Sequence, residues 1–318
     1  MPANHTITTC ISTLLAAITM ANAQAQDYPL KPIRIYTSNI GGSSDFLARL
    51  IAQGIAPSLG QSVVVENRGG IFAAEPVAKA PPDGYSLLLN AGTWYVATLL
   101  SKLPYDPLKD FSAITITSST PNLLVVHPSL PVKSVKELVA LAKAKPGELN
   151  YGAAGVGGAG HLSAELFKSM AGVNIVNIQY KGSGRSVPAL VAGEIQLLFS
   201  DYVPLEAHIK SGRLKALAVT SAQPSELFPG MPTVAAVVPG YVAISNTGLF
   251  APAKTPAVII SKLNQEIVRV LKSPESKERI LRTGSEVVAS TPEELAAWMK
   301  GDMARLSKII KDAGIKIN

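Results

Sequence analysis

The sequence predicts an α/β protein with two lobes, each built around a largely parallel sheet. Three observations carry this prediction. Short apolar runs alternate with amphipathic runs, the alternation restarts near residue 121, and each half contains a strand, a glycine-rich turn and a helix in succession. Alternation of this kind is typical of βαβ units, and 318 residues give enough chain for two lobes.

The first half contains three strand-like runs that are apolar almost throughout, as expected for strands buried on both faces of a parallel sheet. They are IRIYT at 33–37, SVVVEN at 62–67 and SLLLNA at 86–91. An amphipathic helix is predicted over 43–59, ended by Gly60.

The second half repeats this layout. Its predicted strands are NLLVVH, LNYGAA, NIVNIQY, IQLLFSD and LKALAVT, separated by helical stretches. Ser134 and Glu137 have the spacing of a capping box at the start of the first of these helices.

Two more helices are predicted to close the chain and to return to the first lobe. Each begins with an N-cap threonine and a proline, at Thr255-Pro256 and at Thr291-Pro292, the second with Glu294 three residues after its cap. An apolar stripe in the last helix is predicted to pack in the core: Leu295, Trp298, Met299, Met303, Leu306 and Ile310. The first lobe is expected to comprise 26–120 and about 235–318, and the second 121 to about 234.

The amino-terminal segment has the features of an export signal. Residues 1–26 contain no Asp, Glu, Lys or Arg, and ISTLLAAITMA is too short to span a bilayer. ANAQAQ offers cleavage after Ala23 or Ala25, so 1–25 is predicted to be a signal peptide and the mature protein periplasmic. A disordered tail is the alternative. Cys10, the only cysteine, lies in this segment, so the mature chain cannot use a thiol nucleophile.

The net charge favours a small anionic ligand over nucleic acid. The formal charge of +7 belongs wholly to the mature chain, but the basic residues are scattered and form no stripe. No other window is apolar enough to span a membrane.

One turn contains a literal G-x-G-x-x-G at Gly155, Gly157 and Gly160. A dinucleotide site also needs an acidic residue about twenty positions later, and no Asp or Glu occurs between Glu165 and Glu194. No P-loop motif is present either. The sequence therefore predicts no nucleotide or flavin cofactor.

The same turn can still bind an anion, because helix N-termini present N–H groups and glycine allows close approach to the backbone. SNIGGSSD in the first half has the same design. Two such turns facing one another across a cleft would suit a small carboxylate. For Ser43, Ser44 and Asp45 the alternative is simple helix capping.

Catalytic and metal-binding patterns are scarce. The mature chain has three histidines, and neither H-E-x-x-H nor G-x-S-x-G occurs. His127 and His208 are predicted to be structural, whereas His161 either donates to a ligand or stabilises the helix start. Asp201 is a ligand residue or a helix cap, and Lys181 offsets ligand charge or is a solvated loop residue.

Many stretches together resemble one family, the substrate-binding proteins of tripartite tricarboxylate transporters (the Bug family). They include YPLKPIRI, GGSSDFLARLIAQ, APPDGYSLLL, LPYDPLKDF, HLSAELFKSMAG, QYKGSG, GLFAPAKTP and STPEELAAW. In order, the similar stretches cover nearly the whole mature chain.

This resemblance implies a type II periplasmic binding-protein fold that captures a dicarboxylate, tricarboxylate or carboxylated aromatic without chemistry, cofactor or metal. It implies a monomer that works with integral-membrane transporter subunits or a membrane sensor. Carried over to this chain, the expected ligand-binding positions are Ser38, Asn39, Gly41, Gly42, Ser43, Ser44, Asp45, Gly92, Thr93, Gly157, Gly158, Ala159, Gly160, His161, Lys181 and Asp201.

The chain departs from the family pattern at two places near the expected cleft. The usual PFPPGG is TSNIGG here, and the glycine-rich loop after Arg68 is shortened to GGIFA. Family ligand preferences are therefore not transferred. Trp94 and Tyr95 follow the third strand, and they are expected either to form a lid over the ligand or to pack in the core. An extracytoplasmic hydrolase or isomerase that uses Asp45 and His161 is the alternative from another class.

Overall fold

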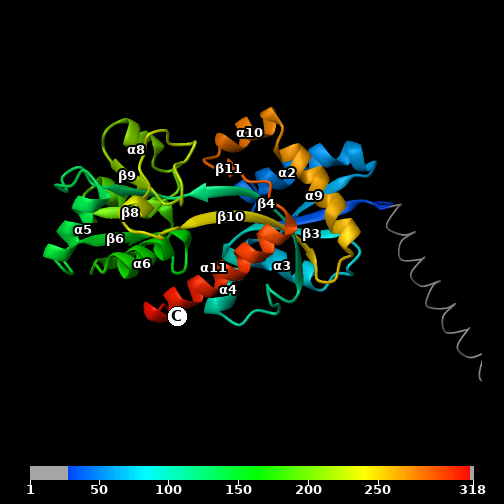
Figure 1. Ribbon diagram of the computed structural model, residues 1–318, viewed down its shortest axis with the longest axis horizontal. Helices are drawn as coiled ribbons and strands as arrows, with labels where there is room; N and C mark the ends of the chain where they lie inside the picture. Colours follow the sequence, from blue (N-terminus) through cyan, green and yellow to red (C-terminus); the bar gives the residue numbers. More distant parts are fainter. Residues whose placement is uncertain (1–27, 316–318) are drawn as a thin grey trace, which may run out of the picture.

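The computed structural model describes residues 28–315, so the predicted signal peptide and Cys10 lie outside the described residues. Two sheets lie side by side along the long axis, and helices cover both (Figure 1). The predicted architecture of two α/β lobes is confirmed, whereas the exact lobe boundaries near 120 and 235 remain predictions.

The first sheet has the strand order β11-β4-β10-β3-β1-β2. Its parallel part is β1 (Ile33–Thr37) between β2 (Val63–Asn67) and β3 (Ser86–Ala91). Three antiparallel strands complete it: β4 (Phe111–Pro121), β10 (Ile244–Pro252) and β11 (Glu286–Val287). Its helices are α2 (Ser43–Leu59), η1 (Gly70–Ala73), α3 (Ala74–Ala78), α4 (Thr93–Leu100), α9 (Ala257–Leu271) and α10 (Pro274–Leu281).

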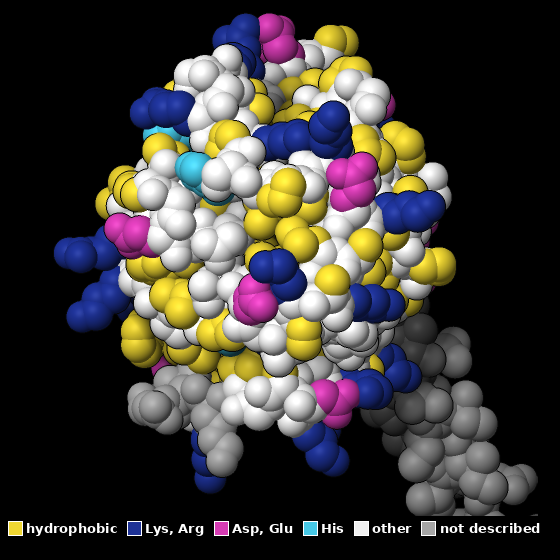
Figure 2. Space-filling model, turned by 90° about the vertical axis from the view of Figure 1, so that its left-hand side faces the viewer, with side chains coloured by type: hydrophobic (Ala, Val, Ile, Leu, Met, Phe, Trp, Pro, Cys, Tyr) yellow, Lys and Arg dark blue, Asp and Glu magenta, His cyan; other side chains and the backbone are white. Residues whose placement is uncertain are grey.

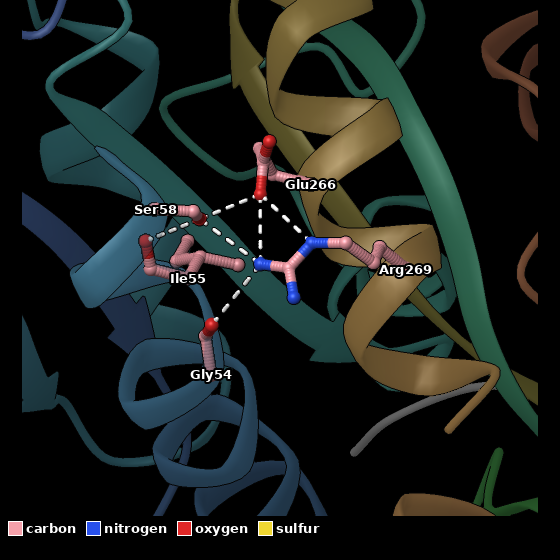
Figure 3. Close-up of polar contacts among 5 residues, drawn as sticks. All are labelled: Gly54, Ile55, Ser58, Glu266 and Arg269. Atoms are coloured by element: carbon pink, nitrogen blue, oxygen red, sulfur yellow. Dashed lines mark hydrogen bonds and ion pairs between the residues drawn. The ribbon is translucent and has the colours of Figure 1, made fainter.

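Helices α2 and α9 pack closely on this sheet because Gly54 has no side chain. A Cβ on Gly54 would lie 2.5 Å from Cγ1 of Val270. Beside this contact, the Arg269 guanidinium donates to Oγ of Ser58 at 3.0 Å and to the carboxylate of Glu266 at 2.8 Å (Figure 3). The apolar contact holds the two helices together, and the exposed polar cluster adds little.

The second sheet has the order β7-β6-β8-β5-β9. Strand β6 (Asn150–Ala153) is parallel to β7 (Val176–Gln179) and β8 (Leu197–Ser200), and β5 (Leu123–Val126) is antiparallel to β8 and β9 (Lys215–Val219). The helices of this lobe are α5 (Val135–Ala144), α6 (Ala159–Ala171), α7 (Ser183–Val191), α8 (Glu206–Lys210) and η2 (Val234–Ala236).

Three elements connect the lobes. Strand β4 leads through Asn122 into β5, and β10 returns the chain to the first sheet beside β4 (Figure 1). The last helix, α11 (Pro292–Asp312), packs against β4 and α4 and also against α6 of the second lobe. Its predicted apolar stripe is confirmed, with Leu295, Met299, Leu306 and Ile310 buried.

Strands β4 and β10 were not predicted, because they contain small polar residues that are typical of loops. Thr115, Thr117 and Ser118 of β4 are fully buried, and Asn246 and Thr247 of β10 are nearly so. Their backbone groups pair with the neighbouring strand, and some hydroxyls also bond to backbone: that of Thr117 donates to the Thr247 carbonyl at 2.9 Å.

The predicted helix starts were only partly right. The capping box of Thr291 and Glu294 is confirmed. The Thr255 prediction is wrong: α9 has Pro256 as its N-cap, and the Thr255 hydroxyl donates to the Pro252 carbonyl instead. Ser134 caps α5, but the Glu137 carboxylate accepts from Lys133 N–H rather than from the cap residue itself. Helix α10, capped by Ser273, was not predicted.

The surface agrees with the scattered charge of the sequence. On the end of the second lobe shown in Figure 2, Lys and Arg side chains are spread over the face rather than gathered in a stripe. Over residues 28–315, no helix has the length and apolarity needed to cross a membrane.

Candidate functional site

The topology collects the predicted site residues at one edge of each parallel sheet. The turns after β1, β2 and β3 begin at Ser38, Arg68 and Gly92, and they lie at the carboxyl edge of the first sheet. In the second lobe the residues after β6, β7 and β8 share an edge in the same way, and Gly182 N–H donates to the Ala154 carbonyl at 2.9 Å. Carboxyl edges of open α/β sheets are where such folds bind ligands.

The two edges meet at a cavity of about 60 Å³, enough for a few water molecules. Gly92 and Thr93 line it from the first lobe, and Gly157 and Ala159 from the second. A Cβ on Gly157 would lie 2.5 Å from Cδ1 of Leu100, so this turn touches α4 directly. Four of the predicted site residues from two lobes therefore line one space.

Four helices begin at these edges, and each has a glycine as its N-cap and no capping side chain. The glycines are Gly42 of α2, Gly92 of α4, Gly158 of α6 and Gly182 of α7. In contrast, α5, α10 and α11 begin elsewhere and have Ser or Thr caps that accept a backbone N–H. At these four starts no N-cap side chain accepts from the first-turn N–H groups, an arrangement that suits an anion.

The first turn is held in shape by the Asp45 carboxylate. It accepts hydrogen bonds from Gly41 N–H at 3.0 Å, from the Asn67 amide at 2.9 Å and from Nε of Arg49 at 3.0 Å. Burial acts to raise the pKa of Asp45, but the bonds from Gly41, Asn67 and Arg49 outweigh it and hold the pKa below its ordinary value. These contacts give Asp45 a structural role in the turn before α2, which is not the helix capping considered as its alternative.

Other polar groups of the first turn differ in exposure. Ser43 is exposed and Ser44 is buried, and neither caps α2. The Ser38 carbonyl accepts from the Asn67 amide at 2.8 Å, and the Asn39 carbonyl accepts from Gly42 N–H at 3.3 Å.

His161 holds the second turn in a similar way. Its Nδ1 accepts from Gly157 N–H at 3.0 Å, and its Nε2 lies 2.9 Å from the amide of Asn177. Because Nδ1 is the acceptor, a neutral imidazole has its proton on Nε2. Oδ1 of Asn177 has no other partner, so the amide orientation that turns this oxygen to Nε2–H satisfies both groups.

Gly157 is the conformationally special residue of this turn. Its φ is +72°, in the left-handed region, whereas Gly158 has φ of −68°. The requirement for glycine on conformational grounds therefore falls on Gly157, whereas the φ of Gly158 suits any residue.

The buried imidazole makes stability dependent on pH. Burial lowers the pKa of His161 below its ordinary value of about 6.5, with Glu165 acting to raise it and Lys168 to lower it. At pH values just below 6.5, the imidazole of His161 is protonated in the unfolded chain but is still neutral in the folded chain. Stability is expected to fall with pH there, by at most about 1.4 kcal/mol per pH unit from this group.

Urea unfolding at pH 7.5 and pH 5.5 measures this effect, with His161→Asn as the variant that cannot titrate. The wild type should lose more stability between the two pH values than the variant does. Equal losses in both proteins would contradict a depressed pKa at His161.

Two candidate residues of the second lobe have side chains open to solvent. Lys181 is exposed at the end of β7, directly before the α7 N-cap. Asp201 follows β8; its side chain reaches solvent, but the protein around it raises the pKa of its carboxyl. Both groups lie at the carboxyl edge of the sheet, free of any ion pair among the described residues.

The cavity is also lined by Asp302 and Arg305, which the sequence did not indicate. The buried Tyr95 donates to Oδ2 of Asp302 at 2.8 Å, and Arg305 pairs with Oδ1 of that carboxylate and donates to the Val242 carbonyl. Nothing local in the sequence predicts this, since Tyr95 and Asp302 are 207 positions apart. The Gly182 cap was also missed, but the strand followed by KGSG and a helix could have indicated it.

Trp94 is a core residue rather than a lid. It is fully buried and packs edge-on against Phe111 and Phe250, with ring centroids 4.8 and 5.2 Å away. A direct hydrogen bond between Asp45 and His161, which would favour an enzyme that uses both, is not among the contacts of these two described side chains.

Two α/β lobes joined by crossing strands, with uncapped helix N-termini at the facing sheet edges, define a solute-binding protein of the type II fold. The family model of the tripartite tricarboxylate transporter family receptor matches residues 47–315, and the chain belongs to this family. The family's description is that of a transport receptor.

Individual relatives match this protein over most of the chain. Protein BugT of Bordetella pertussis is 34% identical over 305 residues, covering 93% of this chain and 94% of its own. An R. palustris protein solved with adipate is 35% identical, with a TM-score of 0.72, and the match covers 91% of this chain and 99% of that one. MatC from Rhodopseudomonas palustris, solved with bound malate, is 29% identical with a TM-score of 0.69 and coverage of 89% and 100%.

Proposed function

We propose that this protein captures a small organic carboxylate between its lobes, in the periplasm, and delivers it to the membrane subunits of a tripartite tricarboxylate-type transporter. The observation that carries the proposal is the set of four glycine-capped helix starts at the two facing edges. A carboxylate accepts hydrogen bonds from such N–H groups and is further stabilised by the partial positive charge of the helix ends. The protein acts as a receptor and does not transform its ligand.

The ligand site comprises the predicted residues of the two turns, with Gly92 and Thr93 between them and with Lys181 and Asp201 at its second-lobe border. Asp45 and His161 act on the ligand indirectly, since they hold the two turns in shape. The carboxylates present in the related structures, adipate and malate, support this ligand class.

A thermal-shift series on the mature protein tests the ligand class. Carboxylates should raise the melting temperature, while their neutral amides should not, because only the charged form engages the N–H groups. Ligand at a hundred times its Kd stabilises the folded state by about 2.7 kcal/mol, a readily measured shift. Stabilisation by neutral sugars and by no carboxylate would contradict the proposal.

A further inference from the structure

We infer that the cleft selects carboxylates with an apolar body over hydroxylated carboxylates and over those with three carboxylate groups, and that Ile40 and Phe72 determine this preference. The inference rests on the proposed function and names the ligand class of the same site. It follows from the position of exposed apolar side chains and from the pairing of charges around them.

Ile40 and Phe72 are exceptionally exposed for large apolar side chains. Their exposed fractions are 80% and 68%, and among the described residues only Leu30, at 71%, is comparable. Ile40 lies in the turn between β1 and α2, and Phe72 in η1 after β2, both at the carboxyl edge of the first sheet. Apolar side chains left in water beside a polar site are typical of ligand contacts.

The segments that present these two side chains lie against one another and against the start of α4. A Cβ on Gly69 would lie 3.2 Å from Oδ1 of Asn39, which places η1 next to the first turn. On its other side, the Tyr105 hydroxyl lies 3.0 Å from the Trp94 carbonyl and 3.5 Å from that of Ile71. The two apolar residues are therefore carried by backbone segments that adjoin the starts of α2 and α4.

The second lobe presents an apolar residue at its own edge. Val156, 44% exposed, lies in the turn before α6, next to Gly157, which contacts Leu100 of the first lobe. A bound molecule that reaches both turns would bring apolar surface to each of them.

Charged groups at these edges are mostly neutralised within the protein. Asp45 pairs with Arg49 at 3.0 Å, and Arg68 pairs with Glu66 at 2.6 Å. Among the described side chains of these turns and of the first helical turns after them, Lys181 and Arg185 remain as cations outside any ion pair, and Asp201 as an unpaired carboxyl. A third carboxylate on a ligand would find no further unpaired cation here, whereas an apolar body would lie beside exposed apolar side chains.

Calorimetric titration of the mature protein with four probes tests the preference. Adipate and benzoate have apolar bodies, while galactarate has the length and charge of adipate but a hydroxyl on each inner carbon, and citrate has three carboxylates. The wild type should bind adipate or benzoate at least tenfold more tightly than either polar probe. Phe72→Ala and Ile40→Ala should each reduce that ratio several-fold.

Leu30→Ala is the matched control, because Leu30 is equally exposed but precedes β1, at the opposite end of the strand. Its probe affinities should equal those of the wild type. Tightest binding of galactarate or citrate would overturn the inference and leave the proposed function intact. Affinities that neither Phe72→Ala nor Ile40→Ala changes would do the same. In that case the two exposed side chains would serve another contact, such as one with a transporter subunit. Binding of none of the four would contradict the proposed function itself.

Discussion

Replacing Asp45 with alanine is expected to destabilise the folded protein by about 2–4 kcal/mol and to weaken carboxylate binding at least tenfold. The carboxylate is buried and accepts from Gly41, Asn67 and Arg49. Removing it leaves the Gly41 N–H and the Asn67 amide without this acceptor. The turn that precedes α2 then loses its defined shape, and with it the arrangement of its N–H groups.

Urea denaturation and calorimetric titration with a bound carboxylate measure the two effects. Glu148→Ala is a suitable control, since Glu148 pairs with Lys145 at 2.9 Å but both side chains are more than half exposed. That change should cost less than about 1 kcal/mol and leave binding unaltered. If Asp45→Ala proves as mild as the control, the carboxylate does not organise this turn.

The regular elements of the parallel sheets could be predicted because local pattern and tertiary role agree in them. Strand β1 is buried on both faces except at Arg34, and α2 has an apolar face with Gly60 at its end, so both were predicted with the observed bounds. The crossing strands could not be found in the same way. Thr115 and Thr117 of β4 are tolerated in the core because their hydroxyls donate to the Ser290 and Thr247 carbonyls and because the backbone of the strand pairs with β10.

In the candidate site, too, the features with a local sequence signal could be predicted, and those that depend on tertiary contacts could not. Glycine-rich turns between a strand and a helix are local signals, so the turns at Gly42 and Gly158 were recognised from the sequence alone. The roles of Asp45 and His161 depend on where each side chain turns, and both turn toward their own loop. Contacts of Asp302 and Arg305 with the cavity depend on α11 packing between the lobes, which no local pattern encodes.

Gly158→Val is expected to reduce carboxylate affinity about tenfold to a hundredfold without unfolding the protein. Gly158 is the N-cap of α6, its φ of −68° suits any residue, and a Cβ there meets only the Gly155 carbonyl, at 3.4 Å. A valine side chain would therefore fit the backbone and stand beside the N–H groups at the start of α6. Losing one charge-assisted hydrogen bond corresponds to about 1.5–3 kcal/mol, which gives the expected range.

Substitutions of one neighbouring glycine, Gly160, and of one distant glycine, Gly301, serve as controls for this result. Gly160→Val should damage the fold itself, because a Cβ at Gly160 would lie 2.2 Å from the Phe199 carbonyl oxygen, a backbone atom that no rotamer change can move. Gly301→Val, on the exposed face of α11 with nothing within 4 Å of its Cβ, should change neither fold nor binding apart from a small gain in helix propensity. Circular dichroism of Gly158→Val must match the wild type, and NAD and FAD should bind to neither protein. Unchanged carboxylate affinity in a correctly folded Gly158→Val would remove the α6 turn from the site, and the N–H groups of α2 and α4 would then have to hold the ligand without it.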